Sequence, residues 1–264
     1  MPHHLNGPGL KLGLGLLSIG RAWGVNKSTP PSEDEAQVLL AKALELGITI
    51  FDTAPAYAES EARLGRFLSA LEPSARRRLI IMTKAGEHWD FGRGSSFVDH
   101  SRDALVRSID RSLSLLGTID VLQLHKATSD VVTHPDVIAA MEYARRCGVT
   151  AFGASVSDVE AGQLALESGL YETVQFPLNM SSANMAPMLP ALEASGRAAI
   201  INRPFAMGGL LTGQSFEEAA MAAFCFIEEH LPRAVILTGT GKVAHLAQNV
   251  SAFQNRPKAR HSVF

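Results

Sequence analysis

The chain alternates between short apolar segments and amphipathic stretches along almost its whole length, and this alternation constrains its fold most. Eight short apolar runs are typical of buried strands, namely residues 12–16, 48–52, 79–83, 121–124, 150–154, 173–176, 198–202 and 234–237. Apolar residues at helical spacing predict helices over residues 33–46, 101–116, 135–147, 158–167, 185–194, 216–229 and 243–252. Ser32 and Glu35 have the spacing of a capping box for the first helix, and Gly47 suits its end.

Strands that are apolar on both faces suit a parallel sheet covered by helices. Eight strand–helix units within 264 residues predict an α/β fold with one domain, a (β/α)8 TIM barrel over residues 1–264. An open doubly wound sheet is the alternative, but Gly13, Gly15 and Gly20 lack the spacing of its G-x-G-x-x-G motif. We interpret Ser95–Ser96, with Gly92 and Gly94, as a loop rather than an interdomain linker.

Composition excludes several classes of protein. The apolar fraction of 46% is sufficient for a large core and excludes intrinsic disorder. A net charge of -2 gives no reason to expect nucleic-acid binding. The chain shows neither a signal-peptide pattern nor an apolar run long enough to span a bilayer, so we expect a cytoplasmic protein without membrane contact. We expect Cys147 and Cys225 to be buried, unpaired residues, and no cluster has the spacing of a metal site.

Polar residues end three neighbouring strands. Asp52, Lys84 and His125 close the second, third and fourth predicted strands, and Tyr57 follows Asp52 in the next loop. Active sites of (β/α)8 barrels form at these strand ends, so the three ionisable groups mark a candidate catalytic site. A nearby Lys84 ammonium, held by Asp52, would lower the pKa of the Tyr57 phenol. This predicts Tyr57 as a proton donor near neutral pH, with His125 orienting a carbonyl oxygen.

The segment from Phe51 to Gly65, which begins Phe-Asp-Thr-Ala-Pro-Ala-Tyr, resembles the signature of the aldo-keto reductases. Further matches are Thr83–Lys84, residues 108–125, residues 175–179, and Gly239–Thr240 followed by residues 245–250. Together they cover residues 12–252 in the order and spacing of the family. The resemblance implies a TIM barrel with the catalytic tetrad Asp52, Tyr57, Lys84 and His125. It also implies NAD(P)H-dependent reduction of aldehydes or ketones to alcohols, with hydride from nicotinamide C4 and Tyr57 as the general acid.

The same resemblance implies a site for NADPH, with NADH as the second choice. Ser155 and Gln175 would bind the nicotinamide carboxamide, although Val156 stands where the family usually has Asn. Asn202 stands where the family has a residue that packs on the nicotinamide. The other implied cofactor residues are Arg203, Pro204, Phe205, Gly208, Gly239, Thr240, Lys242, His245, Gln248 and Asn249. Within this set, Gln248 and Asn249 match the adenine contacts, and Lys242 or His245 would bind the 2′-phosphate.

Trp23, His88 and Trp89 are the predicted walls of a pocket for a small carbonyl substrate. The loops after Gly213 and after Ala252 are shorter than is common in the family, which predicts an open site or one completed by a partner chain. The sequence leaves open whether the protein is a monomer or a homo-oligomer.

The sequence offers one alternative function and two weak motif matches. A non-catalytic regulatory or redox-sensing subunit that binds the cofactor on the same fold is the alternative function. Residues 153–157 resemble a G-x-S-x-G nucleophile elbow, but Ser157 replaces the last glycine, and residues 239–242 lack the first glycine of a P-loop.

Overall fold

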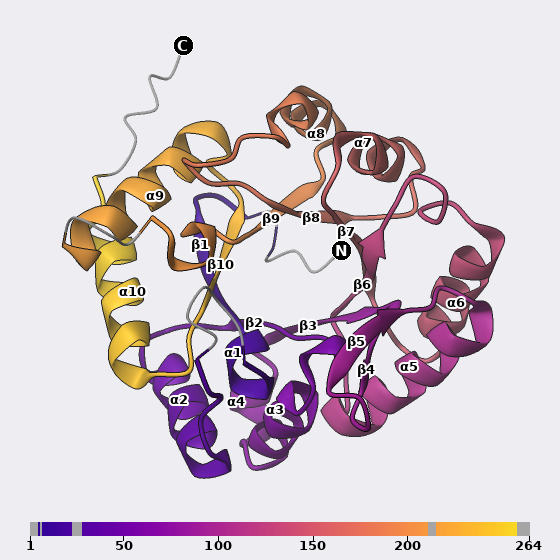
Figure 1. Ribbon diagram of the computed structural model, residues 1–264, viewed down its shortest axis with the longest axis horizontal. Coiled ribbons are helices and arrows are strands. Elements are labelled where there is room, and N and C mark those ends of the chain that lie inside the picture. Colours follow the sequence, from indigo (N-terminus) through magenta and orange to yellow (C-terminus); the bar gives the residue numbers. More distant parts are fainter. Residues whose placement is uncertain (1–4, 6, 23–27, 211–214, 258–264) are drawn as a thin grey trace.

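Eight parallel strands close into a barrel in the computed structural model, which describes residues 5, 7–22, 28–210 and 215–257. The helices lie outside the barrel (Figure 1), as the alternation in the sequence predicts. The strands are β1 (Lys11–Gly15), β2 (Ile50–Asp52), β3 (Ile80–Ala85), β6 (Val121–Ala127), β7 (Ala151–Val156), β8 (Thr173–Pro177), β9 (Ala198–Asn202) and β10 (Val235–Gly239). Their order, β1-β10-β9-β8-β7-β6-β3-β2, confirms the barrel and excludes the open sheet.

The first and last strands close the barrel, although they come from opposite ends of the described chain. They pair in parallel over five residues, from Lys11 with Val235 to Gly15 with Gly239. On its other side β1 pairs with β2, where Leu14 lies opposite Phe51. Every barrel strand therefore has two neighbours, and none presents unpaired backbone groups along an edge.

The main helices are α2 (Glu33–Glu45), α3 (Ser60–Ser69), α5 (Arg102–Leu116), α6 (Pro135–Arg146), α7 (Val159–Glu167), α8 (Leu189–Ser195), α9 (Phe216–His230) and α10 (Val243–Asn255). Shorter elements are α1 (Leu17–Gly20), α4 (Pro73–Arg76) and the 3-10 turns η1 (Pro55–Tyr57), η2 (Ala186–Met188) and η3 (Ala206–Gly208). The capping box of Ser32 and Glu35 is confirmed, and Gly47 follows the helix with a φ of 84°. The helix predicted over residues 185–194 is divided between η2 and α8.

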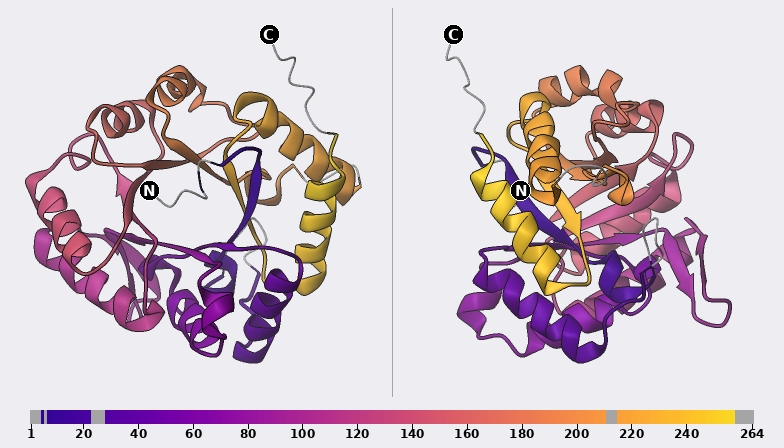
Figure 2. Two further views of the ribbon diagram at one scale, coloured as in Figure 1. Left: turned by 180° about the vertical axis from the view of Figure 1, so that it is seen from behind. Right: turned by 60° about the vertical axis from the view of Figure 1, so that its left-hand side comes forward.

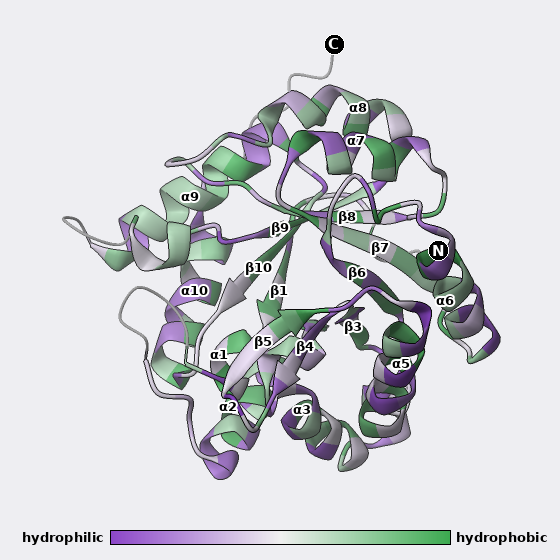
Figure 3. Ribbon diagram, turned by 45° about the vertical axis from the view of Figure 1, so that its right-hand side comes forward, coloured by the Kyte–Doolittle hydropathy of each residue, from purple (hydrophilic) through white to green (hydrophobic). Residues whose placement is uncertain are grey.

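The interior of the barrel has an apolar part and a polar part. Leu5 and side chains from six strands form an apolar cluster that includes Ile50, Ile80 and Val121. The buried polar residues Lys84 and Gln123 follow on two of these strands, nearer their C-terminal ends, and buried Gln175 lies on β8. Figure 3 shows the strands largely in the hydrophobic colour and more hydrophilic colour on the outer helices. The strands thus bring polar groups together only towards one end of the barrel.

An antiparallel hairpin, β4 (Glu87–Asp90) and β5 (Ser95–Val98), follows β3 and projects from the barrel, as the right-hand view of Figure 2 shows. The interpretation of Ser95–Ser96 as loop is wrong, because both residues lie in β5. The turn contains Gly92 and Gly94. β5 is mostly exposed, so it lacks the apolar run by which the barrel strands are recognised.

The expected burial of both cysteines is also wrong. Cys147 is exposed at the C-terminal cap of α6, and Cys225 is half-buried on α9; neither is in a disulfide. In the described part of the chain, no helix combines the length and the apolar character needed to cross a membrane.

Candidate active site

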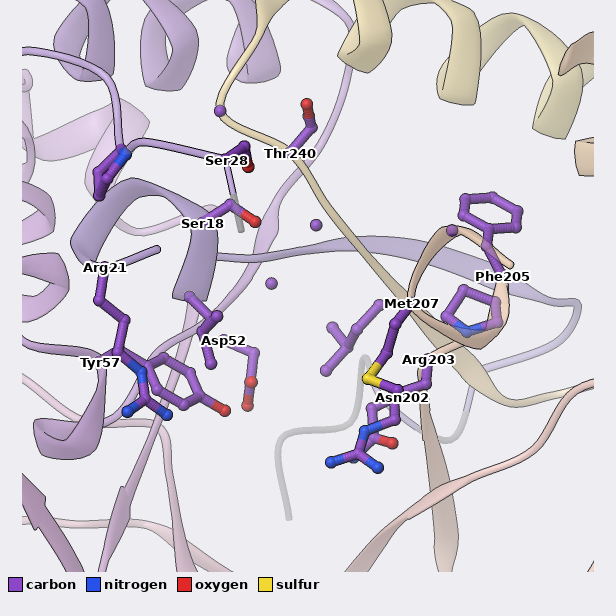
Figure 4. Close-up of a pocket in the computed structure, with 18 of the residues that line it drawn as sticks. Ser18, Arg21, Ser28, Asp52, Tyr57, Asn202, Arg203, Phe205, Met207 and Thr240 are labelled. Carbon is purple, nitrogen blue, oxygen red and sulfur yellow. The ribbon is translucent and has the colours of Figure 1, made fainter. Parts of the chain in front are cut away.

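A large cavity of about 1560 Å³ opens at the C-terminal ends of the barrel strands (Figure 4). Residues at or near the C-terminal ends of seven strands line it, namely Gly15, Asp52, His125, Ser155, Pro177, Asn202 and Gly239. Tyr57 lines it from η1. Two of the three predicted polar strand ends, Asp52 and His125, therefore line one cavity, and the third, Lys84, is buried against Asp52.

A buried ion pair forms the floor of this cavity. Lys84 Nζ donates to Asp52 Oδ2 at 2.5 Å and to the Thr53 carbonyl oxygen at 3.0 Å. Asp52 Oδ1 accepts from Gln123 Nε2 at 2.8 Å and from Gln175 Nε2 at 3.3 Å. The carboxylate is therefore held by three strands besides its own. Gln123 was not singled out from the sequence; its signal is a lone amide within the apolar run 121–124.

Tyr57 lies beside this pair, with Lys84 Nζ 4.9 Å from the centroid of its ring. Burial raises the pKa of the Tyr57 hydroxyl above its ordinary value, and the opposing effect of the Lys84 charge does not reverse this. The Lys84 charge thus acts on this pKa in the expected direction, but burial outweighs it, and the sequence does not show how strongly the fold desolvates the phenol. Burial acts to lower the pKa of Lys84, but the effects of Asp52 and Tyr57 outweigh it and raise that pKa.

His125, which lies on β6, is the fourth predicted catalytic residue. Its ring meets the Tyr57 ring edge-on, with centroids 5.9 Å apart. Burial lowers the pKa of His125 well below its ordinary value, and the Lys84 charge acts in the same direction. The ring is therefore a neutral imidazole near pH 7.

Glu87, the first residue of β4, is a polar residue of the site that sequence reasoning missed. Its Oε2 lies 3.3 Å from His125 Nε2, and both side chains are buried. Glu87 also lines the main cavity. The signal in the sequence is an acidic residue three positions after Lys84, in a segment expected to be loop.

Most of the residues implied as cofactor contacts line the same cavity. Ser155 Oγ donates to Gln175 Oε1 at 3.2 Å. The other lining residues of this set are Arg203, Pro204, Phe205, Gly208, Gly239, Thr240, Lys242 and His245. Gln248 is exposed on α10 and Asn249 is buried in it, and neither lines the cavity.

The loop after β9 has an unusual backbone. Arg203, Ala206 and Met207 all have positive φ, at 54°, 48° and 60°. Non-glycine residues in this region are strained, and such strain clusters at ligand-binding segments. Arg203 and Met207 line the cavity together with Asn202 (Figure 4).

The predicted substrate-pocket residues lie elsewhere than the main cavity, as far as the structure describes them. Trp23 lies outside the described residues. His88 and Trp89 line a second cavity of about 250 Å³ between the hairpin and α5. His88 stacks on Phe97 with ring centroids 5.2 Å apart, and the Arg21 guanidinium lies 4.9 Å from the centroid of the Trp89 ring.

The family model of the aldo/keto reductase family matches residues 11–225. The chain belongs to this family. A curated member, the L-galactose dehydrogenase of Arabidopsis thaliana, is 30% identical over 227 residues, which are 80% of this chain and 66% of that protein. The L-glyceraldehyde 3-phosphate reductase of Escherichia coli K12 is 29% identical over 69% of this chain and 55% of that protein. The chain therefore spans about two thirds or less of the length of these curated aldo-keto reductases.

Solved structures of the family agree with the barrel. The crystal structure of a Pseudomonas aeruginosa protein assigned to the aldo-keto reductases superposes with a TM-score of 0.76 at 29% identity. That match covers 92% of this chain and 88% of the other. The holo form of an aldo-keto reductase from Bacillus halodurans has the same fold, with a TM-score of 0.78 at 22% identity.

Proposed function

We propose that this aldo-keto reductase family member reduces aldehyde or ketone carbonyls to alcohols with a nicotinamide cofactor, NADPH in preference to NADH. The observation that carries the proposal is the buried Asp52–Lys84 pair beside the Tyr57 hydroxyl, on the floor of a cavity open to small molecules. A positioned proton donor next to a fixed positive charge is the arrangement that protonation of a developing alkoxide requires.

The polar groups of the cavity suit a nicotinamide nucleotide. A carboxamide offers two N–H donors and one acceptor oxygen, and the Ser155 hydroxyl and the Gln175 amide can satisfy both kinds. Asn202 Oδ1 is buried without a hydrogen-bond partner among the described residues, so it is an acceptor that a ligand can use. Lys242 and His245 lie at the start of α10, where a 2′-phosphate would find positive charge.

Each side chain of the site has a separate role in the proposed reaction. The cofactor, when bound, supplies the hydride to the carbonyl carbon. Tyr57 donates its hydroxyl proton to the carbonyl oxygen, and its raised pKa keeps that proton in place before reaction. Lys84 stabilises the phenolate that remains, and Asp52 holds Lys84. His125, as a neutral imidazole, orients the carbonyl oxygen.

Oxidation of NADPH in the presence of reactive aldehydes such as nitrobenzaldehyde or methylglyoxal tests the proposal. Tyr57→Phe removes the donor proton, and we expect turnover to fall by about 10²- to 10⁴-fold. Circular dichroism and the affinity for NADPH should stay unchanged. Tyr143→Phe is the matched control, because Tyr143 lies on α6 and its hydroxyl donates to Asp110 at the surface.

Tight binding of NADPH with no oxidation across a broad carbonyl panel would contradict the proposal. It would favour the non-catalytic cofactor-binding subunit instead.

A further inference from the structure

Glu87 is a buried carboxylate without a buried cation. Its Oε1 accepts from Ser96 Oγ at 2.8 Å, and its Oε2 faces His125 Nε2 at 3.3 Å. His125 is its one ion-pair partner among the described residues, and that imidazole is neutral near pH 7. Burying a carboxylate without a neighbouring cation costs free energy unless hydrogen-bond donors surround it.

The backbone fixes this carboxylate in place. Gly86 has a φ of 118°, and a Cβ there would come within 2.5 Å of the His100 ring, so the turn into β4 depends on glycine. Ser96 then reaches Glu87 from the partner strand β5. Glu87 is therefore an acceptor positioned by the hairpin before any ligand binds.

Glu87 has spare acceptor capacity. Two carboxylate oxygens offer about four lone-pair sites. The hydrogen bond from Ser96 uses one of them, and Glu87 lines the main cavity. The ligand group that complements such an acceptor is a hydrogen-bond donor without negative charge, such as a hydroxyl.

The polar surroundings of Glu87 also suit a hydroxylated ligand. Arg21, Ser96 and Lys126 line the cavity together with Glu87 and His125. Two aromatic residues also line the cavity: Phe205, which packs on Phe216 and Phe224, and Tyr57, whose ring meets that of His125. Trp89 lines the second cavity.

We propose that Glu87 determines substrate choice by accepting a hydrogen bond from a hydroxyl on the carbon next to the reacting carbonyl, which makes 2-hydroxyaldehydes the preferred substrates. Its position against His125, which faces Tyr57, places this acceptor next to the group that orients the carbonyl. This inference rests on the proposed carbonyl reduction. A carboxylate–hydroxyl bond is charge-assisted, so it discriminates more than a neutral bond would.

The test compares kcat/KM, per free aldehyde, for lactaldehyde (2-hydroxypropanal), 3-hydroxypropanal and propanal. We expect the protein to prefer lactaldehyde over both others by about tenfold or more. Glu87→Gln keeps the shape and removes the charge, and it should lower the lactaldehyde-to-propanal ratio by about tenfold. Asp90→Asn is the control, because Asp90 lies on the same strand and lines neither described cavity; it should leave the ratio unchanged.

A purely structural Glu87 would give a different result. Glu87→Gln would then lower kcat/KM for both aldehydes alike, and an unchanged ratio overturns the inference while carbonyl reduction stands. The comparison of the three aldehydes on the unaltered protein overturns it as well if 2-hydroxylation gives no advantage, whether or not Glu87→Gln folds.

A binding measurement separates this inference from the proposed function. If no carbonyl is reduced, the proposed function fails, and saturation-transfer NMR without turnover then decides on Glu87. Propane-1,2-diol should receive saturation from the protein and propan-1-ol should not, and Glu87→Gln should abolish the difference. Equal signals from the two alcohols overturn the inference.

Discussion

The Lys84 ammonium and the Asp52 carboxylate are both buried, so each depends on the other for compensation of its charge. Lys84→Met leaves Asp52 with only the amide donors of Gln123 and Gln175. We expect the free energy of unfolding to fall by about 3–5 kcal/mol, measured by urea denaturation. The double variant with Asp52→Asn should recover much of this loss, because it removes the unpaired charge as well. A double variant no more stable than Lys84→Met would contradict this account.

The pH dependence of stability follows from His125. Burial lowers the pKa of His125 in the folded state, whereas the unfolded residue titrates near 6.5. Below about pH 6.5 the unfolded chain therefore binds a proton that folded His125 does not, so the free energy of unfolding falls as pH falls. Lys84 and Lys126 add to the lowering, and Glu87 faces the same ring.

Denaturation at pH 7.5 and at pH 5.5 measures this contribution. His125→Asn removes the titrating group, and we expect it to lose less stability over this interval than the unaltered protein. Other groups titrate in both proteins, so the difference between the two slopes isolates His125. Identical slopes would contradict the lowered pKa.

At the scale of elements, the packing of α1 on η1 depends on a close contact between their backbones at Gly20. A Cβ at Gly20 would clash with the Tyr57 carbonyl oxygen and with the backbone nitrogen of Ser60. These atoms belong to the backbone and cannot rotate away. Gly20→Ala should therefore push α1 off the turn that positions Tyr57, and lower both kcat and the melting temperature.

Gly92→Ala serves as the control for this prediction. A Cβ at Gly92 meets only the Asp90 carboxylate, a flexible side chain, at 3.3 Å. It should leave kcat and the melting temperature unchanged. If Gly20→Ala behaved in the same way, close packing of α1 on η1 would not be what positions Tyr57.

The sequence predicts the barrel strands well because both faces of most of them are buried, which makes apolar runs such as 198–202 conspicuous. The β4–β5 hairpin escaped prediction because β5 is mostly exposed, as at Phe97 and Val98, and the one fully buried side chain of β4 is the polar Glu87. Strands that are buried in the core are thus easier to predict from sequence than strands that are exposed at the surface.

The sequence predicts most residues of the candidate site, but it does not predict how burial shifts their pKa values. Asp52, Lys84 and His125 stand at strand ends, where parallel topology brings them together. The Lys84 charge acts to lower the pKa of Tyr57, as expected, but burial outweighs it, and burial depends on tertiary packing that no local pattern records. Glu87 comes from the hairpin, and its contact with His125 depends on the fold of a segment taken for loop.

At the scale of the whole molecule, closure of the barrel creates one cavity from distant parts of the chain. Because β1 pairs with β10, Gly15 and Gly239 lie side by side at the cavity. The same cavity extends from Tyr57 and His125 to Lys242. One extended ligand can therefore reach both the proton donor and the start of α10.

The extended cavity leads to a prediction about cofactor choice. Lys242 precedes α10 and lines the cavity with an exposed side chain, so its ammonium and the N-terminus of α10 can act together on a 2′-phosphate. We expect Lys242→Ala to weaken NADPH binding by about tenfold and to leave NADH binding unchanged, because NADH has no 2′-phosphate.

Fluorescence titration with both cofactors measures the effect, and raised salt should weaken NADPH binding more than NADH binding because an exposed charge pair is screened. Lys42→Ala is the control, because Lys42 lies on α2, pairs with Glu45 and does not line the cavity. Equal affinities of the unaltered protein for NADPH and NADH would contradict a 2′-phosphate site at the start of α10. The other cofactor contacts would then have to hold either nucleotide without help from Lys242.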